Sequence, residues 1–404
     1  MTNPKEVESV AVWADTVAAG TLRREPRGAV FEYTPEFLHV CQTRGWGLGF
    51  RVPLALLVRT EGVNLHAFLA GLLPEGLRLG ALIRSVKTSA DDLFSLLLAA
   101  GSETVGDVRV TDASEPVLPV VDAARLETIS FAQTLRESLD YVHGPERTAV
   151  PGVQAKISGG RAAVPARGGR GGTEAAILKL GTRELPNLVR NEAFIMEMAR
   201  SCGLAVAETR IVSDRDGEPG LWVTRFDRAR GRRLHQEDGC QLLDRYPEAK
   251  YRVSFTEVMD AVRDVVSSPT VELPRLLELL AFSYLVANGD LHARNVSVLV
   301  GVDGLVRLSP AYDLVTTLPY GDRKLALKVL GRDDHLTRTH FEELAVRYRL
   351  PVKTVASRLD RLCDASPAWI DRLDEIGFPA RKTADLTRVM RARREELGAT
   401  TARN

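Results

Sequence analysis

The sequence NGDLHARN, residues 288–295, follows a long apolar run at 276–287 that predicts a buried helix. Within it, Asp290 and Asn295 stand five positions apart. This is the D-x-x-x-x-N spacing with which protein kinases place a catalytic aspartate and a magnesium-binding asparagine on one loop. An aspartate and an asparagine are also ordinary turn formers. The stretch therefore predicts a polar loop after a buried helix, and phosphate transfer needs support from further residues.

A second carboxylate, Asp313, lies in the run LSPAYDL at 308–314. It follows two strand-like runs, 296–300 and 305–308, as the metal-binding aspartate of a kinase follows the hairpin after its catalytic loop. An aspartate at such a position could equally cap a helix. The order of the segments thus favours a kinase without excluding the simpler interpretation.

Lys179 lies within the apolar run AILKL at 176–180, which predicts a buried strand. A lysine in such a strand needs an anionic partner to stay charged. Glu192, near the start of the next predicted helix, could be that partner, and so could a nucleotide. The helix dipole alone also favours a glutamate there.

The remaining polar candidates give weaker signals. His292 has no second histidine or cysteine nearby in the sequence, so a structural or nucleotide-contacting role is favoured over a zinc site. The run VPGVQAK at 150–156 has a single glycine and by itself predicts only a kinked strand. Ser309 lacks a nucleophile elbow, which leaves hydrolase chemistry unsupported.

Composition is that of an ordinary soluble protein: 404 residues, 45% hydrophobic, 26% charged, with a formal charge of +1. No global attraction to nucleic acid or membrane follows from that charge. The four cysteines are far apart, which predicts reduced, buried thiols rather than zinc ligands or disulfides. No signal peptide and no membrane-spanning run is recognised, so a cytoplasmic location is expected.

Segment by segment, the pattern predicts two lobes. Strand-like runs at 10–13 and 29–33 and helical periods at 65–73 and 93–99 indicate a small α+β unit, and a polar helix follows at 130–143. A β-rich part then holds runs at 149–158, 175–180, 208–213 and 221–225 and a helix at 191–202 closed by Gly203. The Gly/Arg-rich segment 159–172 is expected to be a mobile surface loop rather than an arginine-rich nucleic-acid contact. From 255 onward the chain is mainly helical, which suits ATP binding between two lobes.

Taken in order, these pieces resemble the HipA family: VPGVQAK, ILKL, NEAF, VTRFDR followed by LHQEDGCQ, NGDLHARN and LSPAYDL. The first hundred residues contribute GTL at 20–22, FLAGLLPEG at 68–76 and DLFSLLLAAGSETVG at 92–106. The resemblance implies an α+β, two-lobed, protein-kinase-like fold with a β-rich N-lobe, an extra N-terminal α+β subdomain and a mainly helical C-lobe. The expected boundaries are 1–115 for the subdomain, 116–230 for the N-lobe and 231–404 for the C-lobe.

The same resemblance implies roles for individual residues. Asp290 would be the catalytic base, Asn295 and Asp313 would bind Mg²⁺, and Asp227 would reach the ribose of ATP. The residues implied to bind ATP are Pro151, Gly152, Val153, Gln154, Ala155 and Lys156 over the phosphates, Lys179 on the phosphates, Thr224, Arg225 and Phe226 around the adenine, and His292, Ala293, Arg294, Asn295, Tyr312 and Asp313 in the rest of the pocket.

The implied function is that of a serine/threonine protein kinase acting as the toxin of a toxin–antitoxin pair. Relatives of this family phosphorylate aminoacyl-tRNA synthetases, glutamyl-tRNA synthetase in the best-known case, and thereby arrest translation and growth. The implied partner is a HipB-like helix-turn-helix antitoxin, through which operator DNA would mainly be reached. Two alternatives stay open: a catalytically dead corepressor or scaffold, and a kinase of small molecules or lipids. Retention of Lys179, Asp290, Asn295 and Asp313 counts against the scaffold.

Two departures from the family pattern matter. The family's phosphate loop commonly begins with a serine that becomes autophosphorylated, whereas this chain has Ala149 at that position, with Thr148 beside it. Asp313 is followed by Leu314 and Val315 rather than Phe-Gly, so a movable-phenylalanine switch is not expected.

Because alanine carries no hydroxyl, we expect autophosphorylation to be absent or to occur at Thr148 or Ser158. Mass spectrometry of the purified protein after incubation with ATP and magnesium measures this directly. Stoichiometric phosphate at Thr316 or Thr317 instead would contradict this account of self-regulation.

Overall fold

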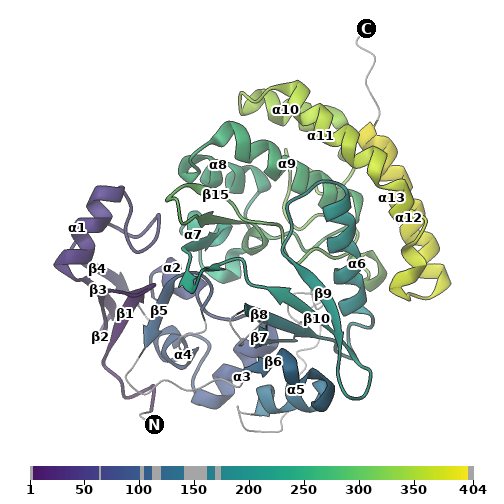
Figure 1. The fold of residues 1–404 in the computed structure, drawn as a ribbon. Coiled ribbons are helices and arrows are strands. Elements are labelled where there is room, and N and C mark those ends of the chain that lie inside the picture. The colour runs from purple at the N-terminus through teal and green to yellow at the C-terminus, as the bar shows by residue number, and fades with distance from the viewer. Residues whose placement is uncertain are drawn as a thin grey trace.

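The computed structural model describes residues 3–62, 65–100, 104–111, 120–140, 162–168 and 174–398 (Figure 1). Its helices are α1 (Pro35–Arg44), α2 (Ala67–Gly71), α3 (Gly76–Val86), α4 (Leu93–Ala100), α5 (Phe131–Asp140), α6 (Leu188–Ser201), α7 (Gly239–Leu242), α8 (Phe255–Val265), α9 (Pro269–Leu285), α10 (Arg338–Arg347), α11 (Val352–Ala365), α12 (Pro367–Ile370) and α13 (Ala380–Gly398). Short 3-10 helices are η1 (Ala123–Thr128), η4 (Pro247–Ala249), η5 (Ala293–Asn295), η6 (Leu318–Tyr320) and η7 (Leu373–Ile376).

The strands are β1 (Ser9–Ala14), β2 (Val17–Glu25), β3 (Gly28–Tyr33), β4 (Leu57–Glu61), β5 (Val108–Thr111), β6 (Val121–Asp122), β7 (Ala162–Gly168), β8 (Glu174–Leu180), β9 (Thr209–Ser213), β10 (Pro219–Thr224), β11 (Arg228–Ala229), β12 (Arg232–Arg233), β13 (Gln236–Asp238), β14 (Ser297–Val300) and β15 (Val306–Leu308). A β-rich half therefore precedes a helical half, as the sequence predicts.

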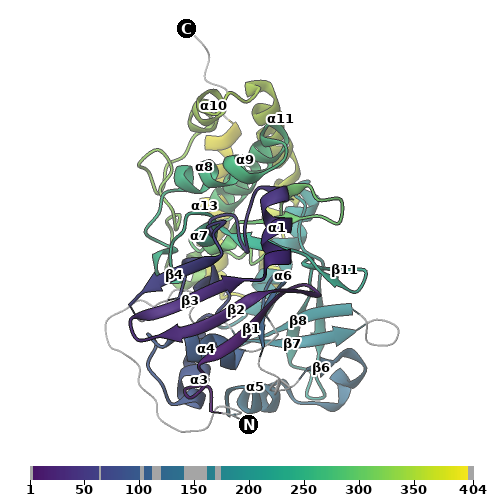
Figure 2. The same cartoon turned by 90° about the vertical axis from the view of Figure 1, so that its left-hand side faces the viewer.

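The first sheet is antiparallel with strand order β4-β3-β2-β1-β5 and lies in front in Figure 2. In β1, Val10, Val12 and Ala14 alternate into an apolar core that α1 and α4 also enter. The sequence indicates β1 and β3 but not β2. A residue larger than glycine would not fit at Gly20 of β2, because a Cβ there would lie 2.2 Å from the backbone oxygen of Glu32.

The second sheet has the order β6-β7-β8-β10-β9, with a short parallel pairing of β6 and β7 and antiparallel pairs elsewhere. The expectation of a mobile loop throughout 159–172 is wrong for 162–168, which form β7 against β8. Inside β7, Val164 and Ala166 point into the core. Flanking glycines and arginines hide this period of two in the sequence. The strand predicted at 149–158 lies outside the described residues.

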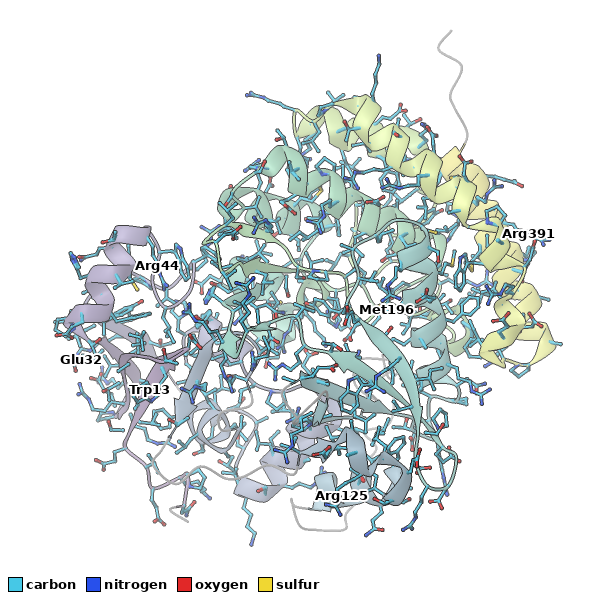
Figure 3. All side chains as sticks on the ribbon, viewed as in Figure 1. Trp13, Glu32, Arg44, Arg125, Met196 and Arg391 are labelled. Atoms are coloured by element: carbon cyan, nitrogen blue, oxygen red, sulfur yellow. The ribbon has the colours of Figure 1, made fainter. Side chains whose placement is uncertain are left out.

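A single apolar core runs from α6 and β10 into α8, α9, α11 and α13. Figure 3 shows Met196 of α6 inside the molecule and Arg391 of α13 at its edge, in agreement with the 0% exposure of Met196. All four cysteines are buried free thiols, as the sequence predicts. Within the described part of the chain, no helix is long and apolar enough to cross a membrane.

His235, just before β13, joins two parts of the molecule: the first sheet with helices α1–α4, called the first domain below, and the helical lobe that begins at β13. Its Nδ1 lies 2.8 Å from Asp107 and its Nε2 lies 2.8 Å from Glu237. The centroid of its ring lies 4.6 Å from that of Trp46, and the ring is stacked on that of Phe68. Burial alone would lower the pKa of His235, but the carboxylates of Asp107 and Glu237 outweigh it and raise that pKa to about 9. At neutral pH a buried imidazolium therefore links the first domain, through Asp107, to the helical lobe, through Glu237.

A folded-state pKa above the ordinary value of about 6.5 adds stability that is complete below pH ~6.5 and is lost as pH rises through about 9. His235→Gln should lower the free energy of unfolding by about 3 kcal/mol at neutral pH, because it leaves two buried carboxylates without a cation. Variant and wild type should converge by about pH 10. Urea unfolding across this range measures the difference, with the exposed His39→Gln as control. A gap between the two proteins that does not change with pH would contradict the charged joint.

Candidate active site

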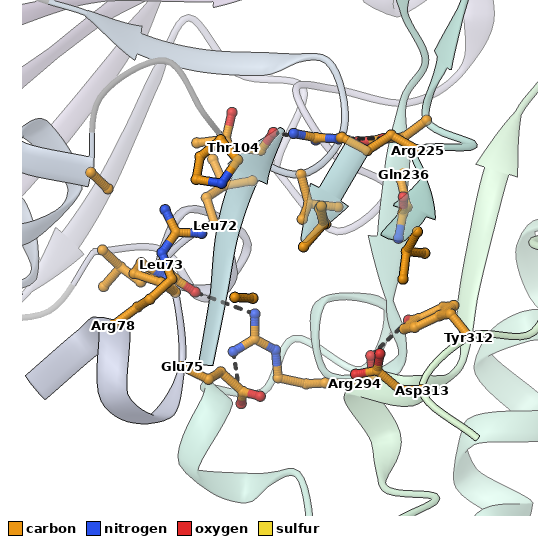
Figure 4. Close-up of a pocket in the computed structure, with 18 of the residues that line it drawn as sticks. Leu72, Leu73, Glu75, Arg78, Thr104, Arg225, Gln236, Arg294, Tyr312 and Asp313 are labelled. Carbon is orange, nitrogen blue, oxygen red and sulfur yellow. Dashed lines mark hydrogen bonds and ion pairs between the residues drawn. The ribbon is translucent and has the colours of Figure 1, made fainter. Parts of the chain in front are cut away.

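A cavity of about 350 Å³ lies between the second sheet, the helical lobe and the first domain (Figure 4). That volume is in the range of small-ligand sites. The predicted residues that line it are Lys179, Thr224, Arg225, Phe226, Asp227, His292, Arg294, Asn295, Tyr312 and Asp313. Asp290 and Ala293 belong to the same loop as His292 but do not line the cavity. Residues 151–156, predicted to cover the phosphates, lie outside the described residues.

Lys179 reaches the cavity because side chains alternate along β8. Leu178 and Leu180 face the core, whereas Ile177 and Lys179 face the cavity together with Val223 of β10. The ammonium group of Lys179 forms ion pairs with Glu192 of α6 and with Asp313. Of the partners that the sequence left open for Lys179, the structure shows Glu192, and Asp313 is a second one.

Helix α6 holds two parts of the site at once. Glu192 is 2% exposed and pairs with Lys179, and the preceding Asn191 fixes the segment after Asp313. The Asn191 side chain donates to the Thr316 carbonyl at 2.9 Å and accepts from the Thr316 amide at 3.0 Å. Asp313 itself has φ +58°, a left-handed conformation uncommon for a residue with a side chain. Its surroundings hold it there, as is typical of functional sites.

The loop carrying Asp290 begins where α9 ends. The Thr317 side chain fixes the backbone at the start of this loop. Its hydroxyl accepts a hydrogen bond from the Gly289 amide at 2.8 Å and donates one to the Ala287 carbonyl at 2.9 Å. Further along, the Asn295 side chain donates to the Asp290 carbonyl at 2.8 Å. That bond closes the loop and commits the amide nitrogen of Asn295 to the protein.

Asp290 is 2% exposed, and its carboxylate accepts a 2.6 Å hydrogen bond from the Tyr251 hydroxyl. The ring of Tyr251 stands at 86° to that of His292, with 5.0 Å between centroids. Both aromatic residues therefore limit the directions open to the Asp290 loop. Tyr251 lies far from the motif in sequence, and no local pattern announces it.

The segment Thr224–Phe226, predicted to hold adenine, is bound to residues of the first domain through Arg225 and the neighbouring Asp227. Arg225 donates to the Thr104 carbonyl at 2.8 Å and to Asp227 at 2.6 Å. Asp227, 4% exposed, also accepts from Arg228 and from the Gly106 amide, each at 2.8 Å. Burial opposes ionisation of Asp227, but the arginines lower its pKa below the ordinary value. Its carboxylate is thus engaged in joining this segment to the first domain.

Tyr312 closes another side of the cavity. Its hydroxyl donates to the Arg294 carbonyl at 2.7 Å and lies 2.5 Å from the Ser297 hydroxyl. Burial raises the pKa of Tyr312 well above its ordinary value, so it stays protonated. The tyrosine therefore contributes a neutral wall next to Asp313.

Magnesium prefers oxygen ligands and is usually held by one or two carboxylates together with phosphates and water. Asn295 offers an amide oxygen and Asp313 a carboxylate to the same cavity, which fits this preference. Among the described residues, no group of three or more His, Cys, Asp or Glu side chains could hold a metal. The residues present fit a magnesium ion shared with a bound nucleotide better than a dedicated protein cage.

The class of protein follows from three features: a sheet that carries a half-buried lysine, a helix that supplies its glutamate, and a helical lobe that carries Asp290, Asn295 and Asp313. This is a protein-kinase-like fold. Sequence models of two domains agree. That of the HipA N-terminal domain matches residues 10–111, and that of the HipA-like C-terminal domain matches residues 148–370. The chain belongs to the HipA family.

Individual relatives support the assignment. Y4mE of Sinorhizobium fredii, whose name marks it as an unproven kinase, is 31% identical over 76% of this chain and 78% of its own length. The serine/threonine-protein kinase toxin HipA of Shewanella oneidensis is 28% identical over 74% of this chain and 75% of its own. A solved complex of HipA, HipB and operator DNA from that organism contains a chain with the same fold, at a TM-score of 0.74 and 22% identity over 96% of this chain and 97% of that one.

ATP with magnesium should raise the thermal midpoint of this protein, because a ligand that binds only the folded state stabilises it by about 2.7 kcal/mol at 100 times its Kd. Lys179→Met should lose much of this shift. Differential scanning fluorimetry with and without nucleotide measures it, and each variant serves as its own reference. Lys324→Met, which removes an exposed lysine paired with Asp333, should keep the full shift. An unmoved wild-type midpoint at millimolar ATP would contradict the nucleotide site.

Proposed function

We propose that this protein is an ATP-dependent serine/threonine protein kinase that acts as the toxin of a toxin–antitoxin pair. The observation that carries the proposal is the ion-pair set of Lys179 with Glu192 and Asp313 on the wall of the cavity. A half-buried lysine paired with carboxylates from two other elements matches the lysine–glutamate pair that protein kinases place on the phosphates of ATP, and removing these three charges from water has a cost that such a function would explain.

Each side chain has a defined task in this proposal. Lys179 binds the phosphates of ATP, and Asp290 accepts the proton of the attacking serine or threonine hydroxyl. Asn295 and Asp313 hold magnesium, which supplies positive charge to the phosphates. Tyr251 keeps the Asp290 carboxylate in one orientation through its 2.6 Å hydrogen bond. Positioning of this kind accounts for most of the catalysis expected of a kinase.

For the substrate we propose an aminoacyl-tRNA synthetase, with glutamyl-tRNA synthetase as the first to test. For the partner we propose a HipB-like helix-turn-helix antitoxin that brings the kinase to operator DNA. The net charge of +1 supports a mainly indirect contact with DNA. Labelled ATP added to the purified chain in a bacterial lysate, followed by identification of the labelled protein, tests the substrate.

The two carboxylates should fail in different ways. Asp290→Asn keeps its size but loses the basic oxygen, so nucleotide binding should remain while phosphate transfer falls about 10²–10⁴-fold. Asp313→Asn should weaken magnesium-dependent nucleotide binding as well. Growth arrest on expression, measured beside nucleotide binding of the purified variants, separates these effects.

Asp303→Asn is a matched control, because this exposed aspartate pairs only locally with Arg307 in the β14–β15 turn. It should arrest growth like the wild type. All three variants should still bind the antitoxin. If Asp290→Asn arrests growth as strongly as the wild type, toxicity does not come from phosphate transfer and the scaffold interpretation must replace the kinase.

A further inference from the structure

Glu75 comes from the first domain, immediately before α3. It nevertheless lines the cavity together with residues of the second sheet and the helical lobe, which are together called the kinase body below. Its carboxylate lies 2.9 Å from the Lys250 ammonium and 3.0 Å from the Arg294 guanidinium. Figure 4 shows the Glu75 carboxylate next to the Arg294 guanidinium, with a dashed line for their ion pair. Burial opposes ionisation of Glu75, but Arg294 and Lys250 lower its pKa below the ordinary value. An ionised carboxylate from the first domain thus pairs with two cations of the kinase body.

Arg294 belongs to the NGDLHARN loop itself, within η5. Besides Glu75, it donates to Asp238 at 2.9 Å and to the Gly71 carbonyl at 2.7 Å. The guanidinium is therefore engaged by protein groups from both domains, although the residue lines the cavity. A planar donor bound on several sides fixes the orientation of the backbone that carries it.

Lys250 connects Glu75 to Asp290 by a second route. The Lys250 carbonyl accepts from the Ala293 amide at 3.1 Å, and the next residue, Tyr251, donates to Asp290 at 2.6 Å. Both cations that Glu75 binds are thus one covalent or hydrogen-bonded step from the loop that carries Asp290. A displacement of Glu75 would therefore reach that loop through both Arg294 and Lys250.

An ion pair between the domains at the surface lacks this connection. Arg51 pairs with Asp264 at 3.5 Å, and both side chains are partly exposed and line no part of the cavity. A surface pair of that kind contributes little to stability. The Glu75 cluster differs in that its partners belong to, or bind, the Asp290 loop.

We propose that Glu75 is a positioning residue for phosphate transfer, through which the first domain holds the Asp290 loop in its working geometry. This rests on the kinase function proposed above. Glu75 acts on Arg294 and Lys250 rather than on substrate, so its loss should lower the rate of transfer and leave nucleotide affinity largely intact.

The experiment compares wild type, Glu75→Ala and Glu75→Gln as full-length chains in phosphate transfer from labelled ATP, with a bacterial lysate as acceptor. For Glu75→Ala the apparent kcat should fall about 10- to 100-fold, since a displacement near 1 Å can cost that much. The apparent KM for ATP should change by less than about threefold. Glu75→Gln, which keeps the shape and accepts hydrogen bonds, should lie between the two and serves if the alanine variant is poorly folded.

A double-mutant cycle measures whether Glu75 and Lys250 act on kcat through each other. A purely structural role of Glu75 would not produce such coupling in kcat. Glu75→Ala and Lys250→Ala should each lower kcat, and together they should lower it by less than the product of the two effects. Asp264→Asn, the matched pair on the surface, should leave kcat and the thermal midpoint unchanged.

The outcomes separate the two proposals. A wild type that transfers no phosphate overturns the proposed function and this inference with it. An active wild type with an equally active Glu75→Ala, or a variant that loses only ATP affinity or thermal stability, overturns the inference alone.

Discussion

The charge on Lys179 is the constraint around which the kinase body is arranged. A buried ammonium group is costly unless carboxylates compensate it, and here they come from α6 and from the segment after β15. The sheet, the helix and the Asp313 segment must therefore meet at one point. Asn191, one residue before Glu192, binds Thr316 and so joins two of these parts, the helix and the Asp313 segment, at a second position. Loss of the lysine would leave two carboxylates together in a partly buried site.

Much of this site could be predicted from local sequence patterns, because its charged residues stand in unusual surroundings or at a fixed spacing in the sequence. A lysine inside an apolar run indicates a charge that needs a partner, and the spacing of Asp290 and Asn295 indicates a shared loop. Helix α6, β8, β10 and the β14–β15 hairpin were indicated by periodicity and glycine to within a few residues. The two lobes follow from the order of these segments.

The unpredicted features depend on contacts between distant parts of the chain. Tyr251 and Glu75 have no motif around them, and only the folded chain brings them to the Asp290 loop. Asp227 lines the cavity, and no sequence pattern indicated that its carboxylate also binds two arginines and a first-domain amide; its role at the ribose stays a prediction. Strand β7 was hidden by flanking glycines and arginines. The roles assigned to residues 151–156 stay predictions.

The bonds between the first domain and the kinase body join residues that a ribosome makes far apart in time. Asp107, Glu75 and Gly106 are synthesised early, whereas their partners His235, Arg294 and Asp227 follow much later. Domains generally fold as units, the N-terminal one first, and the first domain has an apolar core of its own. It can therefore be folded before the Asp290 loop exists. The contacts of Glu75 with Arg294 can form only once residue 294 has been made, so a chain interrupted before that point would carry the first domain without the Asp290 loop that it contacts.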